Sequence, residues 1–160
     1  MLRITVVCVG KLKEKYFADA VVEYGKRLSR YCRLEIKEAA DEKTPDGASA
    51  AEEEQIKSRE GGRILKNIRD DDYVIALAIE GKQLSSPELA DKLVRLANAG
   101  QSQLVFVIGG SLGLSDEVLA RADLRLSFSR LTFPHQLMRV VLLEQIYRSF
   151  RINQGEPYHK

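Results

Sequence analysis

The chain has 160 residues and a mass of 18.0 kDa, with 44% hydrophobic residues, 30% charged residues and a net charge of +2. This length and composition predict one domain, residues 1–160, with a sizeable core, which excludes disordered and fibrous proteins. No apolar run approaches the roughly 18 residues of a membrane span, and lysines at 11, 13 and 15 interrupt the N-terminal apolar stretch too early for a secretory signal, so we expect a cytoplasmic protein without a membrane partner.

Strand and helix patterns alternate along the first half of the chain. In order, the sequence predicts a strand at Leu2–Val9, a helix over about 14–29, a strand at Leu34–Glu38, a loop at 41–48 and a helix opening at Ser49. Pro45 and Gly47 mark the loop. Ser49 followed three residues later by Glu52 is a capping-box pattern, which is typical of a helix start.

The second half repeats the alternation with clearer punctuation. It predicts a strand at Tyr73–Ile79 ended by Gly81, a helix from Ser86 to Gly100, a strand at Leu104–Ile108, a short helix at Ser115, a strand at Leu124–Phe128 and a last helix from Pro134 to about Asn153. Together the elements predict an α/β fold with a mostly parallel sheet of about five strands and helices on both faces.

The last predicted helix is apolar around most of its circumference. Such a helix needs burial on more than one side. In a chain this small a subunit interface is a place to find it, so we expect a homodimer.

Charge is distributed unevenly along the chain. Residues 1–38 hold nine Lys/Arg and five Asp/Glu, residues 39–120 hold nine and fifteen, and residues 121–160 hold seven and three. If the two basic ends meet in space they form a patch for a polyanion such as RNA. Charge alone favours the simpler interpretation of solvated helix faces.

Neither histidines nor cysteines form a metal-binding pattern. His135 and His159 are the only histidines and are too far apart in sequence for a metal cluster, so no metal is predicted. Cys8 and Cys32 match no metal or redox spacing and are predicted to be reduced packing residues. His135 falls in the first turn of the last helix, where the helix dipole favours a neutral imidazole.

Gly109, Gly110 and Gly113 lie between a predicted strand and helix, where missing side chains let a ligand approach the backbone. Their order is not G-x-G-x-x-G and they do not follow the first strand, which disfavours a nicotinamide dinucleotide site. Taken alone, these glycines are better explained as residues of tight turns than as a ligand site.

Two arginines, Arg139 and Arg148, lie on the apolar last helix and need a partner if they are buried. That partner is an anionic ligand or a residue across an interface. For Arg148 there is a local alternative, because Glu144 precedes it by four residues and forms a helical ion pair with it.

The sequence also resembles one family along its whole length. The run Leu131–Val141 (LTFPHQLMRVV), its continuation Glu144–Arg148 (EQIYR) and the ending Pro157–Lys160 (PYHK) are similar to the bacterial 23S rRNA pseudouridine N3-methyltransferases of the SPOUT class. The same resemblance includes Gly10–Tyr16, Ala78–Lys82, and Phe106–Ser111 with the following Gly113-Leu114.

This resemblance implies a deep trefoil knot in the C-terminal half of an α/β fold, a homodimer, and S-adenosylmethionine held by three loops. The implied cofactor positions are Leu77, Gly109, Phe128, Ser129, Arg130, Leu131, Thr132 and Phe133. All of them fall at or beyond the carboxyl ends of predicted parallel strands, where α/β sheets bind ligands.

The implied reaction is methyl transfer to N3 of a pseudouridine in 23S rRNA within the ribosome, with neither metal nor DNA involved. The catalytic candidates are His135, Arg139, Arg148, Tyr158 and His159. We expect the arginines to orient phosphate or base and the tail to close over the substrate; no general base is assigned. Two alternatives remain, namely a non-catalytic RNA- or ribosome-binding protein on the same scaffold and a nucleotide-dependent oxidoreductase.

Overall fold

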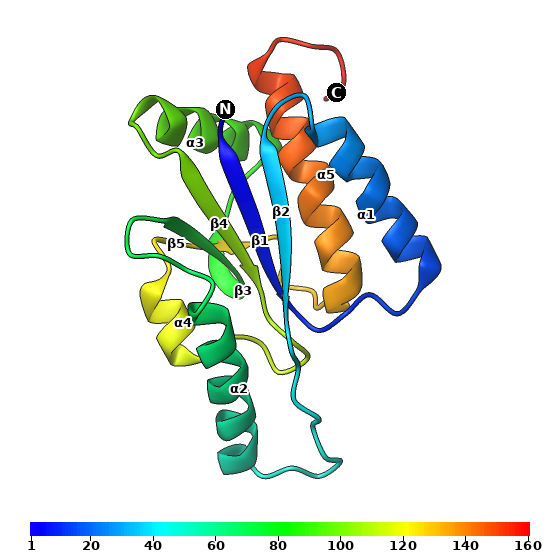
Figure 1. Cartoon of the computed structure of the whole chain (residues 1–160), viewed down its shortest axis with the longest axis vertical. Coiled ribbons are helices and arrows are strands. Elements are labelled where there is room, and N and C mark those ends of the chain that lie inside the picture. The colour runs from blue at the N-terminus through cyan, green and yellow to red at the C-terminus, as the bar shows by residue number, and fades with distance from the viewer.

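Five strands form the centre of the structure, a computed structural model that describes residues 1–160 (Figure 1). The strands are β1 (Arg3–Val9), β2 (Arg33–Ala39), β3 (Tyr73–Gln83), β4 (Gln103–Ile108) and β5 (Leu124–Ser127). They lie in the order β2-β1-β4-β3-β5, and every neighbouring pair is parallel. The predicted sheet is confirmed, and all its carboxyl ends lie at one edge.

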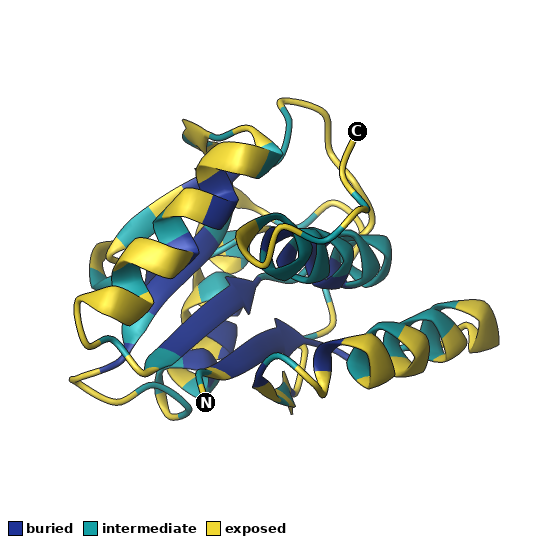
Figure 2. Cartoon of the chain, turned by 90° about the horizontal axis from the view of Figure 1, so that it is seen from above, coloured by how far each residue is buried: buried dark blue, intermediate teal, exposed yellow.

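Helices cover both faces of this sheet, as predicted. They are α1 (Lys15–Leu28), α2 (Ala50–Leu65), α3 (Ser86–Asn98), α4 (Asp116–Arg121) and α5 (His135–Asn153). Successive strand side chains point to opposite faces. Along β1, Ile4 and Val6 therefore enter the core under α1, α3 and α5, whereas Val7 enters the core under α2 and α4. Figure 2 shows the buried residues concentrated in the strands and on the inward sides of the helices.

Side-chain caps confirm the predicted starts of α2 and α3. Ser49 Oγ accepts from the Glu52 N–H at 3.1 Å, and Glu52 Oε1 accepts from the Ser49 N–H at 3.3 Å. In α3 the helix begins at Ser86 as predicted, but the cap is Ser85, because Glu88 lies the required three residues after it.

The structure corrects the predicted ends of two strands. Gly81 was expected to end the third strand, yet β3 continues to Gln83. Leu126 of β5 pairs with Leu77 before an irregularity in β3 and with Lys82 after it, so the intervening residues leave the ladder and return. A Cβ on Gly81 would lie 2.7 Å from the carbonyl carbon of Arg125, which means that this glycine permits close contact with β5. The predicted end of the fifth strand shifts by one residue, leaving Phe128 as the first residue of the following loop.

Helix α5 packs between α1 and α3 over the sheet (Figure 1). Leu142, Leu143 and Ile146 of α5 are buried in this way. Leu137, Met138, Val140 and Val141 stay half-buried, so the homodimer expected from the sequence stays a prediction. No helix of the structure has the length and apolarity needed to span a bilayer.

Both cysteines are buried and unpaired, with exposures of 1% for Cys8 and 2% for Cys32. Burial raises the thiol pKa to about 11 for Cys8 and about 12 for Cys32. Neither thiol ionises near neutral pH, so the prediction that they are packing residues is confirmed.

Candidate functional site

A cavity of about 780 Å³ lies at the carboxyl edge of the sheet. Its walls are three segments far apart in sequence: Leu77–Glu80 of β3, Ile108–Leu114 after β4, and residues between 126 and 135 after β5. Parallel strands bring these segments together because they deliver their carboxyl ends to one edge. The volume lies in the range of roughly 300–1,000 Å³ typical of small-molecule sites.

Seven of the eight cofactor positions implied by sequence line this single cavity: Leu77, Gly109, Phe128, Ser129, Leu131, Thr132 and Phe133. The eighth, Arg130, is exposed and does not contribute to the lining. The structure therefore brings the three expected loops to one place.

The glycine loop after β4 presents bare main chain to the cavity. The Gly113 N–H donates to the Gly110 carbonyl at 3.1 Å, closing a tight turn, and Gly113 has a φ of +88° that suits glycine. A Cβ on Gly109 would lie 2.9 Å from the carbonyl carbon of Gly113. A side chain at position 109 would therefore push the loop apart.

Three charged residues that line the cavity were not identified from the sequence. Glu80 follows the apolar part of β3 and is exposed, so the rule that ligands bind at strand ends was enough to find it. Lys57 and Asp116 come from α2 and α4, and no local pattern links those helices to the site. Lys57 is paired with Glu54 at 2.6 Å.

His135 is the one catalytic candidate that lines the cavity. It is the first residue of α5 and is half-buried. Burial, reinforced by the positive charge of Arg139, lowers the pKa of His135 below its usual 6.5. The direction of this shift favours the neutral imidazole expected from sequence, and burial is its largest cause.

Arg139 is turned into the protein and is only 2% exposed. Its guanidinium donates to Glu38 Oε2 at 2.7 Å and to the Gly10 carbonyl at 3.2 Å. The partner expected from sequence was an anionic ligand or an interface residue, and the structure instead supplies a carboxylate from β2 of the same chain. Contact of Arg139 with RNA stays a prediction.

The remaining candidates form a hydrogen-bonded cluster between the C-terminal half of α5 and the tail that follows it. Arg148 donates to Glu144 at 2.9 and 3.2 Å, so the local ion pair considered from sequence is present. The Tyr158 hydroxyl donates to Glu144 at 2.7 Å, and His159 Nδ1 lies 3.1 Å from Arg148. Burial and the bond to Glu144 raise the pKa of Tyr158 to about 12. Thirteen residues of helix separate Arg148 from His135, or about 20 Å.

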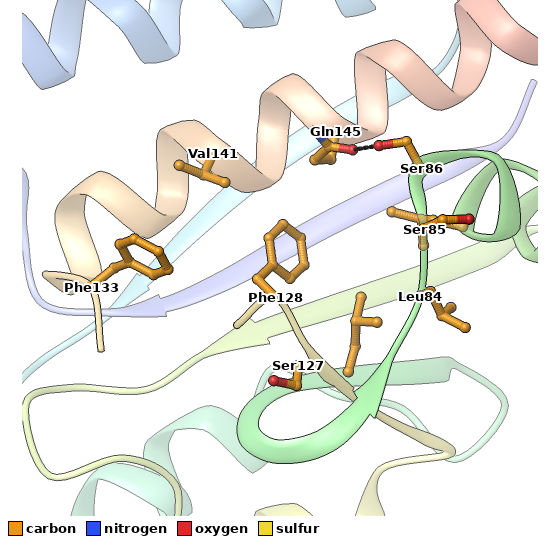
Figure 3. Close-up of a pocket in the computed structure, with 10 residues that line it drawn as sticks. Leu84, Ser85, Ser86, Ser127, Phe128, Phe133, Val141 and Gln145 are labelled. Atoms are coloured by element: carbon orange, nitrogen blue, oxygen red, sulfur yellow. Dashed lines mark hydrogen bonds between the residues drawn. The ribbon is translucent and has the colours of Figure 1, made fainter. Parts of the chain in front are cut away.

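A second cavity of about 270 Å³ adjoins the first and shares Leu126, Phe128 and Phe133 with it (Figure 3). It opens between α3 and α5, where Ser86 Oγ donates to Gln145 Oε1 at 2.6 Å. Its walls extend the larger cavity toward α5.

Comparison with known proteins gives a consistent result. Residues 2–159 match the family described as "Predicted SPOUT methyltransferase". The chain is 63% identical to Ribosomal RNA large subunit methyltransferase H of Bifidobacterium adolescentis and 62% identical to the protein of that name from Clostridioides difficile. Each alignment spans 159 residues, which is 99% of this chain and 100% of the relative.

Proposed function

This chain belongs to the SPOUT methyltransferase family, and we propose that it transfers a methyl group from S-adenosylmethionine to N3 of a pseudouridine in 23S rRNA, acting on ribosomes in the cytoplasm. The names of its relatives support large-subunit ribosomal RNA as the substrate. The observation that carries the proposal is the cavity at the carboxyl edge of the sheet, because three separate loops expected to hold the cofactor converge there.

The cavity residues fit S-adenosylmethionine chemically. Leu77, Leu131 and Phe133 offer apolar surface of the kind that suits an adenine ring. The glycine loop offers main-chain donors and acceptors without side-chain obstruction. Glu80 and Asp116 offer carboxylates toward a ligand with positive charge and hydroxyl groups. When bound, the cofactor supplies a methyl group that its sulfonium has already activated.

The protein's own contribution is then alignment, exclusion of water and acceptance of a proton. The loop after β5 and the glycine loop orient the methyl group toward the base. Leu131 and Phe133, exposed by 71% and 38%, stand at the cavity where a bound cofactor would cover them and exclude water. His135 is neutral and lines the cavity, so it is the residue placed to accept the N3 proton.

Arg148, Tyr158 and His159 do not reach this cavity within one chain, since about 20 Å of helix intervenes. We therefore propose that they act in the cavity of a second copy within a homodimer. Apolar side chains exposed beside the cavity, Ile79 at 44% and Leu131 at 71%, support an interface there.

The charge distribution supports an RNA partner. Helix α1 from the basic N-terminal region packs beside α5 from the basic C-terminal region (Figure 1). The two regions of the sequence with excess positive charge therefore lie side by side, and this supports a polyanion-binding surface.

We also propose the trefoil knot implied by the resemblance. Its support is the excursion of β3, which pairs with Leu126 both before and after leaving the ladder. The close approach of Gly81 to the β5 backbone means that β3 bends tightly around this strand. Figure 3 shows the curved end of β3 beside the segment that carries Ser127 and Phe128.

The test combines calorimetry with methyl transfer. Titration with S-adenosylmethionine should show binding, and labelled methyl groups should enter ribosomes from a strain that lacks the homologous enzyme. Ribosome association without incorporation would instead establish the non-catalytic binding protein. Thermal stabilisation by a dinucleotide and none by S-adenosylmethionine would establish the oxidoreductase and refute the proposal.

A further inference from the structure

Glu60 is a buried carboxyl that nothing in the proposed mechanism uses. It lies on α2 and is only 4% exposed. Its Oε2 accepts from the Glu42 N–H at 3.0 Å, whereas its Oε1 is buried without a hydrogen-bond partner. A buried polar atom with no partner is costly, so its presence calls for a physical reason.

This carboxyl lies directly behind the glycine loop. A Cβ on Gly110 would lie 3.0 Å from Glu60 Oε1 and 3.3 Å from Oε2, and Gly110 itself lines the cavity. Only the bare backbone of one glycine therefore separates the carboxyl from the ligand space.

No lysine or arginine forms an ion pair with Glu60. The charged groups that face it are Asp41 and Glu42, on the segment after β2, and Arg63 of α2. Arg63 is already bonded to Glu42 Oε1 at 2.6 Å and to the Ala40 carbonyl at 2.9 Å. Gly110, which faces the carboxyl from the glycine loop, carries no charge. Burial, reinforced by Asp41, raises the pKa of Glu60.

We propose that Glu60 is the counter-charge that makes the cavity prefer cationic S-adenosylmethionine to the neutral product S-adenosylhomocysteine. This rests on the proposed function. Methyl transfer forms the N–CH₃ bond with the electron pair of the base, returns the C–S pair to sulfur and releases the N3 proton. The ligand thereby loses its net positive charge, and with it the attraction of the carboxylate, so product is exchanged for new cofactor.

Burial makes Glu60 effective over this distance. Charges that act through the protein interior are screened much less than charges in water. Glu80 and Asp116 line the same cavity but are exposed, so solvent weakens their discrimination between the two ligands. Glu60 is therefore a positioning residue, whose buried negative charge favours the positively charged ligand without contacting it.

The test is calorimetry of both ligands with Glu60→Gln. Glutamine keeps the shape and can still accept from the Glu42 N–H, but it removes the charge. We expect affinity for S-adenosylmethionine to fall about tenfold and affinity for S-adenosylhomocysteine to stay within about twofold. Asp71→Asn is the matched control, because it removes one exposed negative charge just before β3, at the opposite edge of the sheet, and should leave the ratio of the two affinities unchanged.

An unchanged ratio of the two affinities in Glu60→Gln would overturn the inference. An equal loss of affinity for both ligands would also overturn it, because it would mean that Glu60 only supports the structure of the loop. If the variant does not fold, the same ratio is measured in His135→Gln, which removes the imidazole titration. There the preference for S-adenosylmethionine should shrink as the solution is acidified, because burial raises the pKa of the Glu60 carboxyl and the carboxyl takes up a proton; a flat ratio refutes the inference. Failure of the unmutated protein to bind either ligand would instead refute the proposed function.

Discussion

Replacing Arg139 with methionine should destabilise the protein by about 3 kcal/mol. The guanidinium is 2% exposed and bridges α5 to β2 through Glu38 and to the end of β1 through Gly10. Methionine fills much of the same volume, so the variant removes the charge and its hydrogen bonds with little cavity formation.

The magnitude follows from the unequal burial of the two partners. Removing one member of a fully buried pair costs about 3–5 kcal/mol because the other charge is left without compensation. The Glu38 side chain is 37% exposed and regains water once Arg139 is gone, which places the cost at the lower end of that range. For a chain of this size about 3 kcal/mol corresponds to a decrease in Tm of roughly 6–12 °C.

The assay is urea and thermal unfolding of Arg139→Met, Glu38→Gln and the double variant. Glu38→Gln leaves a buried guanidinium unpaired, so the double variant should be less destabilised than the sum of the singles, by about 2 kcal/mol. Arg95→Met is the control, because its pair with Asp91 is 77% and 56% exposed and contributes less than about 1 kcal/mol.

Two results would refute this reasoning. An Arg139→Met protein that unfolds like the unmutated chain would show that the ion pair carries no stability. Unchanged stability together with lost ribosome methylation would show that Arg139 contacts RNA, as first expected from sequence. Full methylation by a folded Arg139→Ala protein would remove that RNA role.

The other predictions concern backbone contact and pH. Gly109→Ala should abolish cofactor binding in calorimetry, because its Cβ meets the Gly113 backbone. The control Gly62→Ala has open space around its Cβ and should stabilise α2 by up to about 1 kcal/mol. Normal cofactor binding by Gly109→Ala would contradict the cavity assignment. Gly81→Ala should lower the free energy of unfolding by about 2 kcal/mol, measured in urea, since β5 backbone occupies the Cβ position; an unchanged midpoint would argue against the tight bend. At saturating cofactor, methyl transfer that depends on neutral His135 should be constant near pH 7 and decline only below pH 6.5, because burial lowers this pKa; an acid limb that persists in His135→Gln would assign the proton acceptor elsewhere.

Local patterns in the sequence determined which elements occur and in which order. Apolar runs marked all five strands, and Ser49 with Glu52 marked a helix start that the structure confirms. These features depend on residues within a few positions of one another, which is why the sequence alone was sufficient. The family resemblance implied Leu77, Gly109 and Phe128 as cofactor positions, and the rule that parallel strands bind ligands beyond their carboxyl ends agrees with the one cavity that all three line.

Only the tertiary structure decided which distant residues meet. Arg139 pairs with a carboxylate 101 positions away, and the Glu60 carboxyl lies against Gly110 from another helix. The strand order β2-β1-β4-β3-β5 and the break in register between β3 and β5 likewise have no local signal. Such contacts arise because the whole chain packs its apolar faces at once, so a partner is chosen by position in the fold and not by spacing along the sequence.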